Sequence, residues 1–278
     1  VSCEWVLFDN SREAKQAPKH ADPETEEYRS PKDCPFEDLL GSGNEILWLY
    51  PNSENWEIAV IKNKYPALVS GVCVPGHTNG PFNVNNAIGS HDVIVYKNHE
   101  THFADMSTEH LSSVIKVYKK RYNEILESGG DCVHHIMIFH NFGVGVGASV
   151  YHPHSQIVSM PILPPDISRS LRGSQKFYKE KGKKIYDLLV GWEIEQKDRI
   201  VYENDFFVAF CPFVSKYPYE LRIFPKDGHA HFEKMPEALD TYLADIMSVV
   251  FRKLKKALNN PSYNFFIHTA SAKEDLEN

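Results

Sequence analysis

Residues 147–157, with the sequence GASVYHPHSQI, contain the most informative pattern of this chain. In an extended strand, alternate side chains point to opposite faces. His152, His154 and Gln156 would therefore lie on one face, and the residues between them on the other. Three polar groups that converge on one surface, directly after a backbone segment that could cradle a phosphate, indicate chemistry on a nucleotide phosphate.

The residues before the histidines strengthen this prediction, since a lone His-x-His pair is expected by chance in a chain with 14 histidines. Glycines let a backbone approach an anion closely and turn its N–H groups toward it. The alternative is a Gly-rich hairpin that leads into an edge strand marked by Pro153. The residues that favour an anion site are Asn141, Gly143, Gly145, Gly147 and Ser149.

Composition excludes several classes of protein. With 42% hydrophobic and 24% charged residues, the 278-residue chain is typical of one large globular domain or two smaller ones. The net charge of -7 argues against a nucleic-acid backbone binder, which depends on clustered Lys and Arg. No apolar signal stretch or membrane-length run is present, so we predict no membrane association. Five widely spaced cysteines, an odd number, favour the reducing cytoplasm.

A strand–loop–helix unit occurs twice in the chain. In the first copy, a strand at 91–99 precedes an amphipathic helix that starts at the N-cap Ser107 and ends near Leu126. In the second copy, a strand at 219–229 precedes a helix over 236–258. An apolar run suited to a returning strand follows each helix, at 133–139 and 264–268.

This self-similarity predicts an α+β fold made of two copies, each with antiparallel strands and a packed helix. We place the first unit, with the histidine motif, at 1–165, and the second at 166–278, where we expect it to be incomplete at its C-terminus. A proline-stiffened linker is expected at 161–166, followed by a connecting helix over 176–189. Residues 199–210 are expected to form a hairpin.

Cys34 and Glu37 have the spacing of a Cys-x-x-Cys zinc half-site, with a carboxylate in place of the second thiolate. Zinc accepts carboxylate oxygen, thiolate and imidazole, so His99 and His152 could complete a four-ligand structural site. In the alternative interpretation, Cys34 is a buried thiol and Glu37 a carboxylate at the start of a helix. The spacing alone does not decide between them.

Five motifs spread along the chain form a recognisable set: Cys34–Phe36, Asn63–Leu68, Asn141 with the Gly-rich loop, His152–Gln156 and Tyr263–His268. Together they resemble the galactose-1-phosphate uridylyltransferase family, the transferase branch of the histidine-triad superfamily. The resemblance runs over nearly the whole chain. It implies two fused histidine-triad-like units, a homodimer, and ping-pong transfer of a nucleoside monophosphate through a histidine.

The resemblance also implies roles for single residues. His154 would be the nucleophile, with Gln156 and Ser149 as its phosphate partners. Zinc would be bound by Cys34, Glu37, His99 and His152. The substrate-binding residues would be Arg12, Phe36, Asn63, Tyr65, Asn141 and Gly147.

Elementary chemistry agrees with these roles. A neutral imidazole is a competent nucleophile toward an α-phosphate, and a covalent His154–nucleotide splits one displacement into two. No general base is needed if a backbone carbonyl holds the second ring nitrogen. We therefore predict an enzyme that moves a nucleoside monophosphate between a nucleotide sugar and a sugar 1-phosphate.

Three alternatives stay open at this stage. With inorganic phosphate as the acceptor, the enzyme would be a phosphorylase acting on ADP-glucose or a dinucleoside polyphosphate. With water as the acceptor it would be a hydrolase, but Gln156 cannot act as an acid or base, which favours transfer. The third alternative is a non-catalytic, zinc-stabilised nucleotide-binding protein that has kept only the scaffold.

Overall fold

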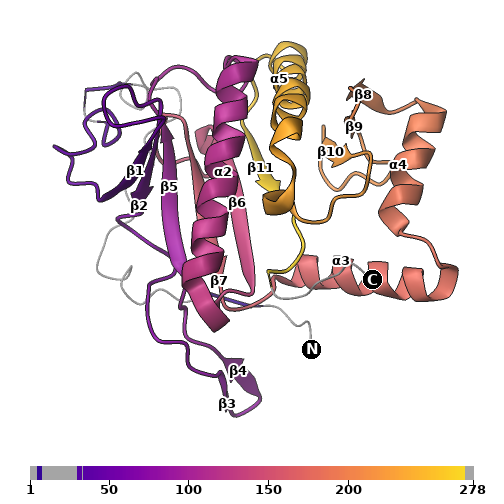
Figure 1. The fold of residues 1–278 in the computed structure, drawn as a ribbon, viewed down its shortest axis with the longest axis horizontal. Coiled ribbons are helices and arrows are strands. Elements are labelled where there is room, and N and C mark those ends of the chain that lie inside the picture. The colour runs from indigo at the N-terminus through magenta and orange to yellow at the C-terminus, as the bar shows by residue number, and fades with distance from the viewer. Residues whose placement is uncertain (1–4, 8–29, 33, 273–278) are drawn as a thin grey trace. The chain divides into compact units, whose positions relative to one another are not determined.

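The computed structural model describes residues 5–7, 30–32 and 34–272 of the chain, so the predicted substrate residue Arg12 lies outside the described residues. The fold is α+β with antiparallel sheets, as predicted (Figure 1). Contacts between residues divide the chain into two compact units. Of the described residues, the first unit contains those up to 100, with 120–165 and 262–272, and the second contains 101–119 and 166–261.

A six-stranded antiparallel sheet forms the centre of the first unit, with the strand order β1-β2-β5-β7-β6-β11. The returning strands predicted after each helix are present as β6 and β11, and they pair with each other in this one sheet. The strands are β1 (Ile46–Tyr50), β2 (Ile58–Lys62), β5 (Ser90–Tyr96), β6 (His135–Phe142), β7 (His154–Met160) and β11 (Tyr263–Ile267).

Strand β7 lies between β5 and β6 and is hydrogen-bonded on both sides. The alternative of an edge strand at this place is therefore wrong. Pro153 stands just before the first strand residue, His154, and its carbonyl still accepts a hydrogen bond from the backbone N–H of Tyr96 at 3.2 Å. The Tyr96 carbonyl, which an N–H at position 153 would face, accepts from Nε2 of His152 instead. His152, predicted as part of the strand, precedes it.

Helix α2 (Thr108–Gly129) follows β5 and begins where the sequence predicts, since the Ser107 hydroxyl accepts a hydrogen bond from the backbone N–H of His110 at 3.2 Å. Its C-terminal part, from residue 120, belongs to the first unit. There Arg121 donates two hydrogen bonds to the buried carboxylate of Asp92 on β5, at 2.8 and 2.9 Å. This ion pair attaches the helix to the face of the sheet opposite to Val93 and Gln156.

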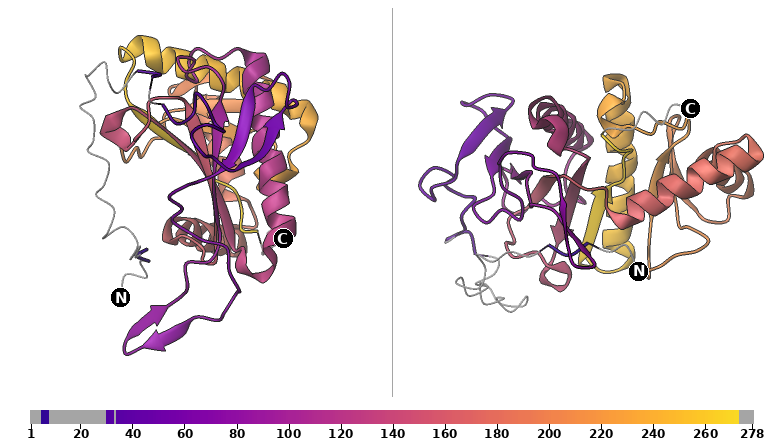
Figure 2. Two further views of the ribbon diagram at one scale, coloured as in Figure 1. Left: turned by 90° about the vertical axis from the view of Figure 1, so that its left-hand side faces the viewer. Right: turned by 90° about the horizontal axis from the view of Figure 1, so that it is seen from below.

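Two short strands, β3 (His77–Asn79) and β4 (Phe82–Val84), form a separate ribbon that extends away from the six-stranded sheet (Figure 2). The segment before it is joined by a disulfide from Cys73 to Cys132, in the 3-10 turn η2 (Gly130–Cys132). The cysteine spacing does not predict this pair. Disulfides are rare in a reducing cytoplasm, so this pair gives no support to the predicted cytoplasmic location. That location stays a prediction.

The second unit has a three-stranded antiparallel sheet in the order β10-β9-β8, in which β8 and β9 form the predicted hairpin. Val190, Val208 and Phe210 form an apolar core there. The short 3-10 turns are η3 (Val144–Val146), in the first unit, and η4 (Phe232–Lys234) and η5 (Glu237–Leu239) in the second. The other elements of the second unit are β8 (Ile200–Glu203), β9 (Phe207–Phe210), β10 (Arg222–Pro225), α3 (Pro165–Lys181), α4 (Ile185–Gln196) and α5 (Asp240–Ala257).

The predicted single connecting helix over 176–189 is wrong, because two helices, α3 and α4, occupy this region. They are separated at Gly182, whose φ of 63° is a left-handed conformation that ends a helix. The predicted linker is shorter than expected, since α3 begins at Pro165. Within the described ranges, no helix has both the length and the apolar character needed to cross a lipid bilayer.

We expect Arg121→Met to lower the free energy of unfolding by about 3 kcal/mol, because it leaves the buried carboxylate of Asp92 without its cation. Urea denaturation measures this change. Lys120→Met, at an exposed site on the same helix, is the control and should cost less than about 1 kcal/mol. Asp92→Asn should restore part of the loss in the Arg121 variant. Equal, small effects of the two single substitutions would show that the ion pair does not hold the helix.

Candidate functional site

One face of the sheet carries the predicted nucleophile and its neighbours. His154 and Gln156 on β7 stand opposite Val95 and Val93 on β5, so all four side chains point to the same face. Phe36 packs with these valines in an apolar cluster, and its ring centroid lies 5.1 Å from that of His154. The His154 ring therefore packs against an apolar surface, which restricts the motion of the ring and the access of water to it.

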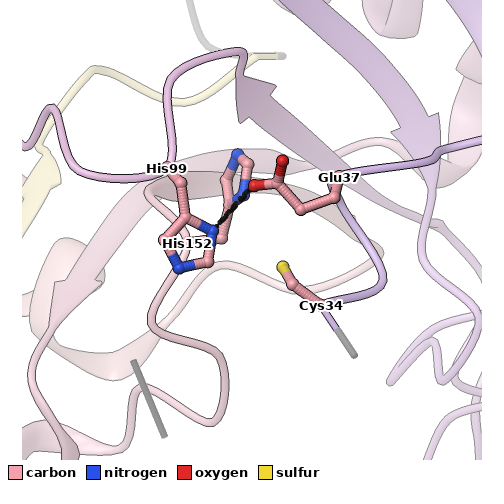
Figure 3. A group of neighbouring side chains, drawn as sticks. All are labelled: Cys34, Glu37, His99 and His152. Atoms are coloured by element: carbon pink, nitrogen blue, oxygen red, sulfur yellow. Dashed lines mark hydrogen bonds and ion pairs between the residues drawn. The ribbon is translucent and has the colours of Figure 1, made fainter. Parts of the chain in front are cut away.

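Four potential metal ligands meet beside this face, and they are the four predicted from the sequence (Figure 3). One ligand atom from each of Cys34, Glu37, His99 and His152 lies within 4.8 Å of the other three. An oxygen of Glu37 is 2.8 Å from Nδ1 of His99 and 3.1 Å from Nδ1 of His152. One sulfur, one carboxylate and two imidazoles are a donor set that suits Zn²⁺.

The orientation of His152 fits a ligand. Its Nε2 donates a hydrogen bond of 2.7 Å to the backbone carbonyl of Tyr96, so the lone pair is on Nδ1, which points into the cluster. Metal-binding histidines commonly use their second nitrogen in this way. Burial lowers the pKa of His152, and the nearby His99 lowers it further, against the opposing effects of the Tyr96 carbonyl and Glu37. The ring is therefore neutral at pH 7, as metal binding requires.

The alternative interpretation of the cysteine and the carboxylate is only partly compatible with the structure. Cys34 is half-buried against apolar side chains, and burial raises the pKa of its thiol, with a smaller contribution from Glu37. Glu37, however, lies in a turn and not at the start of a helix, and its carboxylate faces the two histidines. A bound cation would favour the thiolate and reverse the pKa shift.

The ring of His154 is oriented by the backbone. Its Nδ1 donates a hydrogen bond of 2.8 Å to the carbonyl of His152, which leaves the lone pair on Nε2. In the described part of the chain, Nε2 has no hydrogen-bond partner. Burial lowers the pKa of His154 to about 4, so the ring is neutral at pH 7. A neutral, oriented imidazole with an available lone pair has the properties of a nucleophile.

The end of β6 and the loop that follows it carry further predicted residues. Asn141 lies near the end of β6, on the same face as Gln156 by strand alternation. Gly143 and Gly147 adopt φ angles of 92° and 86°, which glycine reaches without strain. The backbone N–H groups of 146 and 148 both bond to the carbonyl of Gly143 at 3.3 Å. Ser149 is exposed, and its hydroxyl bonds to no described residue.

Gln156 is held by a residue to which the sequence assigns no role. Its Oε1 lies 2.8 Å from Nε2 of His91, which belongs to β5. His91 also lies 3.0 Å from the Asn63 amide nitrogen and 3.0 Å from the backbone nitrogen of Ala67. Tyr65, predicted to bind substrate in this segment, is 62% exposed. From the sequence, the alternation of residues along β5 could have predicted that His91 lies on the same face as the site. It could not have predicted that His91 lies next to Gln156.

Comparison with known proteins identifies the family. Residues 2–164 match the family model described as galactose-1-phosphate uridyl transferase, N-terminal domain. The chain belongs to the galactose-1-phosphate uridylyltransferase family. Residues 193–274 match the HIT domain, so the resemblance and the prediction of two fused histidine-triad-like units are confirmed.

Individual members of the family show similarity along most of their length. An ADP-glucose phosphorylase from Arabidopsis thaliana is 30% identical over 98% of this chain and 77% of its own. A galactose-1-phosphate uridylyltransferase from Thermotoga maritima is 31% identical over 80% of this chain and 70% of its own. The crystal structure of an Arabidopsis thaliana ADP-glucose phosphorylase with bound ADP-glucose superposes with a TM-score of 0.76 and 30% identity, over 89% of this chain and 76% of that one. Nucleotidyl transfer and phosphorolysis are both represented among these relatives.

We expect the four-residue cluster to bind Co²⁺, a spectroscopic probe for tetrahedral sites, with a thiolate-to-cobalt charge-transfer band in the near ultraviolet. Titration of the metal-free protein measures it. Cys34→Ser should remove the band, because Cys34 supplies the only sulfur of the cluster. Cys211→Ser removes a half-buried thiol outside the cluster and should leave the band unchanged. A band that survives Cys34→Ser would place the metal elsewhere.

Proposed function

We propose that the chain is a nucleotidyltransferase that moves a nucleoside monophosphate between a nucleotide sugar and a sugar 1-phosphate, with His154 as the covalent carrier. The observation that carries this proposal is the hydrogen bond from Nδ1 of His154 to the carbonyl of His152. It fixes the tautomer in which Nε2 can attack, on a sheet face that also presents Gln156. Membership of the family supports the reaction class.

In the first half-reaction, Nε2 of His154 attacks the α-phosphorus of the nucleotide sugar. A nitrogen–phosphorus bond forms, the bond from phosphorus to the bridging oxygen breaks, and sugar 1-phosphate leaves with that electron pair. The imidazole becomes cationic, and its Nδ1–H then bonds more strongly to the carbonyl of His152. In the second half-reaction an anionic oxygen of the acceptor attacks the same phosphorus and releases the histidine. Neither step requires a general base.

Phosphoryl transfer depends chiefly on positioning and charge stabilisation, so the remaining residues are proposed to act as donors. The Gln156 amide, the Ser149 hydroxyl and the backbone at Gly147 would surround the phosphate oxygens. Phe36, Asn63 and Tyr65 would bind the nucleoside, and Asn141 would support the site from β6. The exposure of Ser149 and Tyr65 is compatible with contact to a ligand.

We further propose that Zn²⁺ occupies the cluster of Cys34, Glu37, His99 and His152. Its role would be structural. The metal would fix His152, whose backbone carbonyl orients His154. The homodimer implied by the resemblance remains a prediction.

A second candidate function differs only in the acceptor. With inorganic phosphate in place of a sugar 1-phosphate, the same half-reactions give a phosphorylase. The relative that aligns with 98% of this chain is an ADP-glucose phosphorylase, which favours this candidate and adenine as its base.

We expect covalent labelling of His154 when the protein is mixed with UDP-glucose or ADP-glucose that carries ³²P in the α-phosphate. The label should be acid-labile, because a phosphoramidate hydrolyses in acid. His154→Asn should abolish it, whereas His77→Asn, at an exposed site on β3, should not. Binding of UMP or AMP without any label in the wild type would instead support the non-catalytic alternative.

The acceptor is tested by chasing the labelled protein. We expect galactose 1-phosphate or glucose 1-phosphate to discharge the label at least tenfold faster than buffer alone, with a nucleotide sugar as the product. Discharge by inorganic phosphate, with release of a nucleoside diphosphate, would identify a phosphorylase. Equally fast discharge without an acceptor would identify a hydrolase and contradict both candidates.

A further inference from the structure

His91 contacts two parts of the site that are distant in sequence. Its Nε2 lies 2.8 Å from Oε1 of Gln156 on β7, and its Nδ1 lies 3.0 Å from the backbone nitrogen of Ala67. The same Nε2 is 3.0 Å from the side-chain nitrogen of Asn63. Gln156 and Asn63 are a proposed phosphate ligand and a proposed nucleoside ligand. The mechanism above assigns no part to the histidine that lies between them.

The donors around the ring determine its tautomer. The backbone N–H of Ala67 can only donate, so Nδ1 must carry a lone pair and Nε2 the hydrogen. Asn63 uses its Oδ1 to accept from the backbone N–H of Tyr65 at 2.9 Å, and it therefore turns its nitrogen, another donor, toward the ring. Between Asn63 and Gln156, which both lie within 3.0 Å of Nε2, Gln156 is the one that offers an acceptor.

The tautomer of His91 in turn determines how Gln156 is oriented. With Oε1 held by the Nε2–H of His91, the amide NH₂ is the end that remains for a ligand. A primary amide presents either a donor or an acceptor, depending on a half-turn of its last bond. The NH₂ end stabilises an anionic phosphate oxygen, whereas the oxygen end would repel it. One hydrogen bond therefore decides whether Gln156 helps or hinders charge stabilisation.

We propose that His91 is a positioning residue that locks the Gln156 amide with its NH₂ toward the phosphate and ties the 63–67 segment to β7. This inference rests on the proposed function for its phosphate. This role requires no contact of His91 with the phosphate or the nucleoside. It acts through Gln156 on the rate and through the 63–67 segment on nucleotide binding.

Two substitutions separate these two effects. In His91→Asn, the side-chain oxygen lies near the place of Nδ1 and can still accept from Ala67, but the donor to Gln156 is lost. In His91→Gln, the longer amide reaches the place of Nε2 and keeps that donor, but the acceptor for Ala67 is lost. Each variant thus retains one of the two hydrogen bonds and serves as the control for the other.

We expect His91→Asn to slow single-turnover labelling of His154 by UDP-glucose or ADP-glucose about 10- to 100-fold, with the half-saturating donor concentration changed less than about threefold. His91→Gln should do the reverse, raising that concentration about tenfold and keeping the maximal rate within about threefold. In a Gln156→Ala background, His91→Asn should add less than about twofold. Additive losses, or equal losses of rate and affinity in both variants, would overturn the positioning role.

An independent measurement needs no substrate. Long-range ¹H–¹⁵N NMR of the histidine rings should show His91 as the neutral Nε2–H tautomer at pH 7. A protonated Nδ1 would overturn the inference whatever the kinetics. If the wild type is labelled and His91→Asn is labelled at the same rate, the positioning role is overturned and the proposed function stands. An unlabelled wild type would overturn the proposed function and, with it, the phosphate role of Gln156 and His91.

Discussion

The hydrogen bond from Nδ1 of His154 to the backbone carbonyl of His152 is the contact on which the proposed chemistry of this chain depends. A net stabilisation of about 1 kcal/mol is modest for folding, yet the bond selects one of two tautomers and one ring orientation. Because the donor and the acceptor belong to residues only two positions apart, the bond forms only when the backbone of residues 152–154 keeps one conformation. Much of the surrounding structure serves this requirement.

His152 is held from two sides. Its Nε2 bonds to the carbonyl of Tyr96 at the end of β5, and its Nδ1 faces the cluster with Glu37 and His99. On the opposite face of the sheet, the hydroxyl of Ser155 lies 2.6 Å from the Tyr96 hydroxyl. The backbone that orients the proposed nucleophile is therefore fixed by polar contacts on both faces of the sheet, in addition to the sheet hydrogen bonds of a central strand.

The position of β7 between β5 and β6 also determines which residues can cooperate. Pairing with β5 brings His91 beside Gln156, although 65 residues separate them in the chain. Pairing with β6 places Asn141 on the same face. In an edge strand, one of these two neighbours would be absent. A central strand is therefore a condition for bringing the proposed phosphate, nucleoside and supporting residues onto one surface.

Local patterns in the sequence determined several features of this protein. The alternation of His154 and Gln156 predicted their common face, and the Ser107 cap predicted the start of α2. The spacing of Cys34 and Glu37 indicated, as one of two interpretations, half of the cluster that could hold a metal. Each of these depends on residues a few positions apart, where backbone geometry leaves few choices. Tertiary structure alone decided the central place of β7, the pairing of β11 with β6, the disulfide of Cys73 and the contact of His91 with Gln156. These features depend on which strands pair. Strand pairing is set by the burial of whole faces of the sheet, and no single motif encodes that burial.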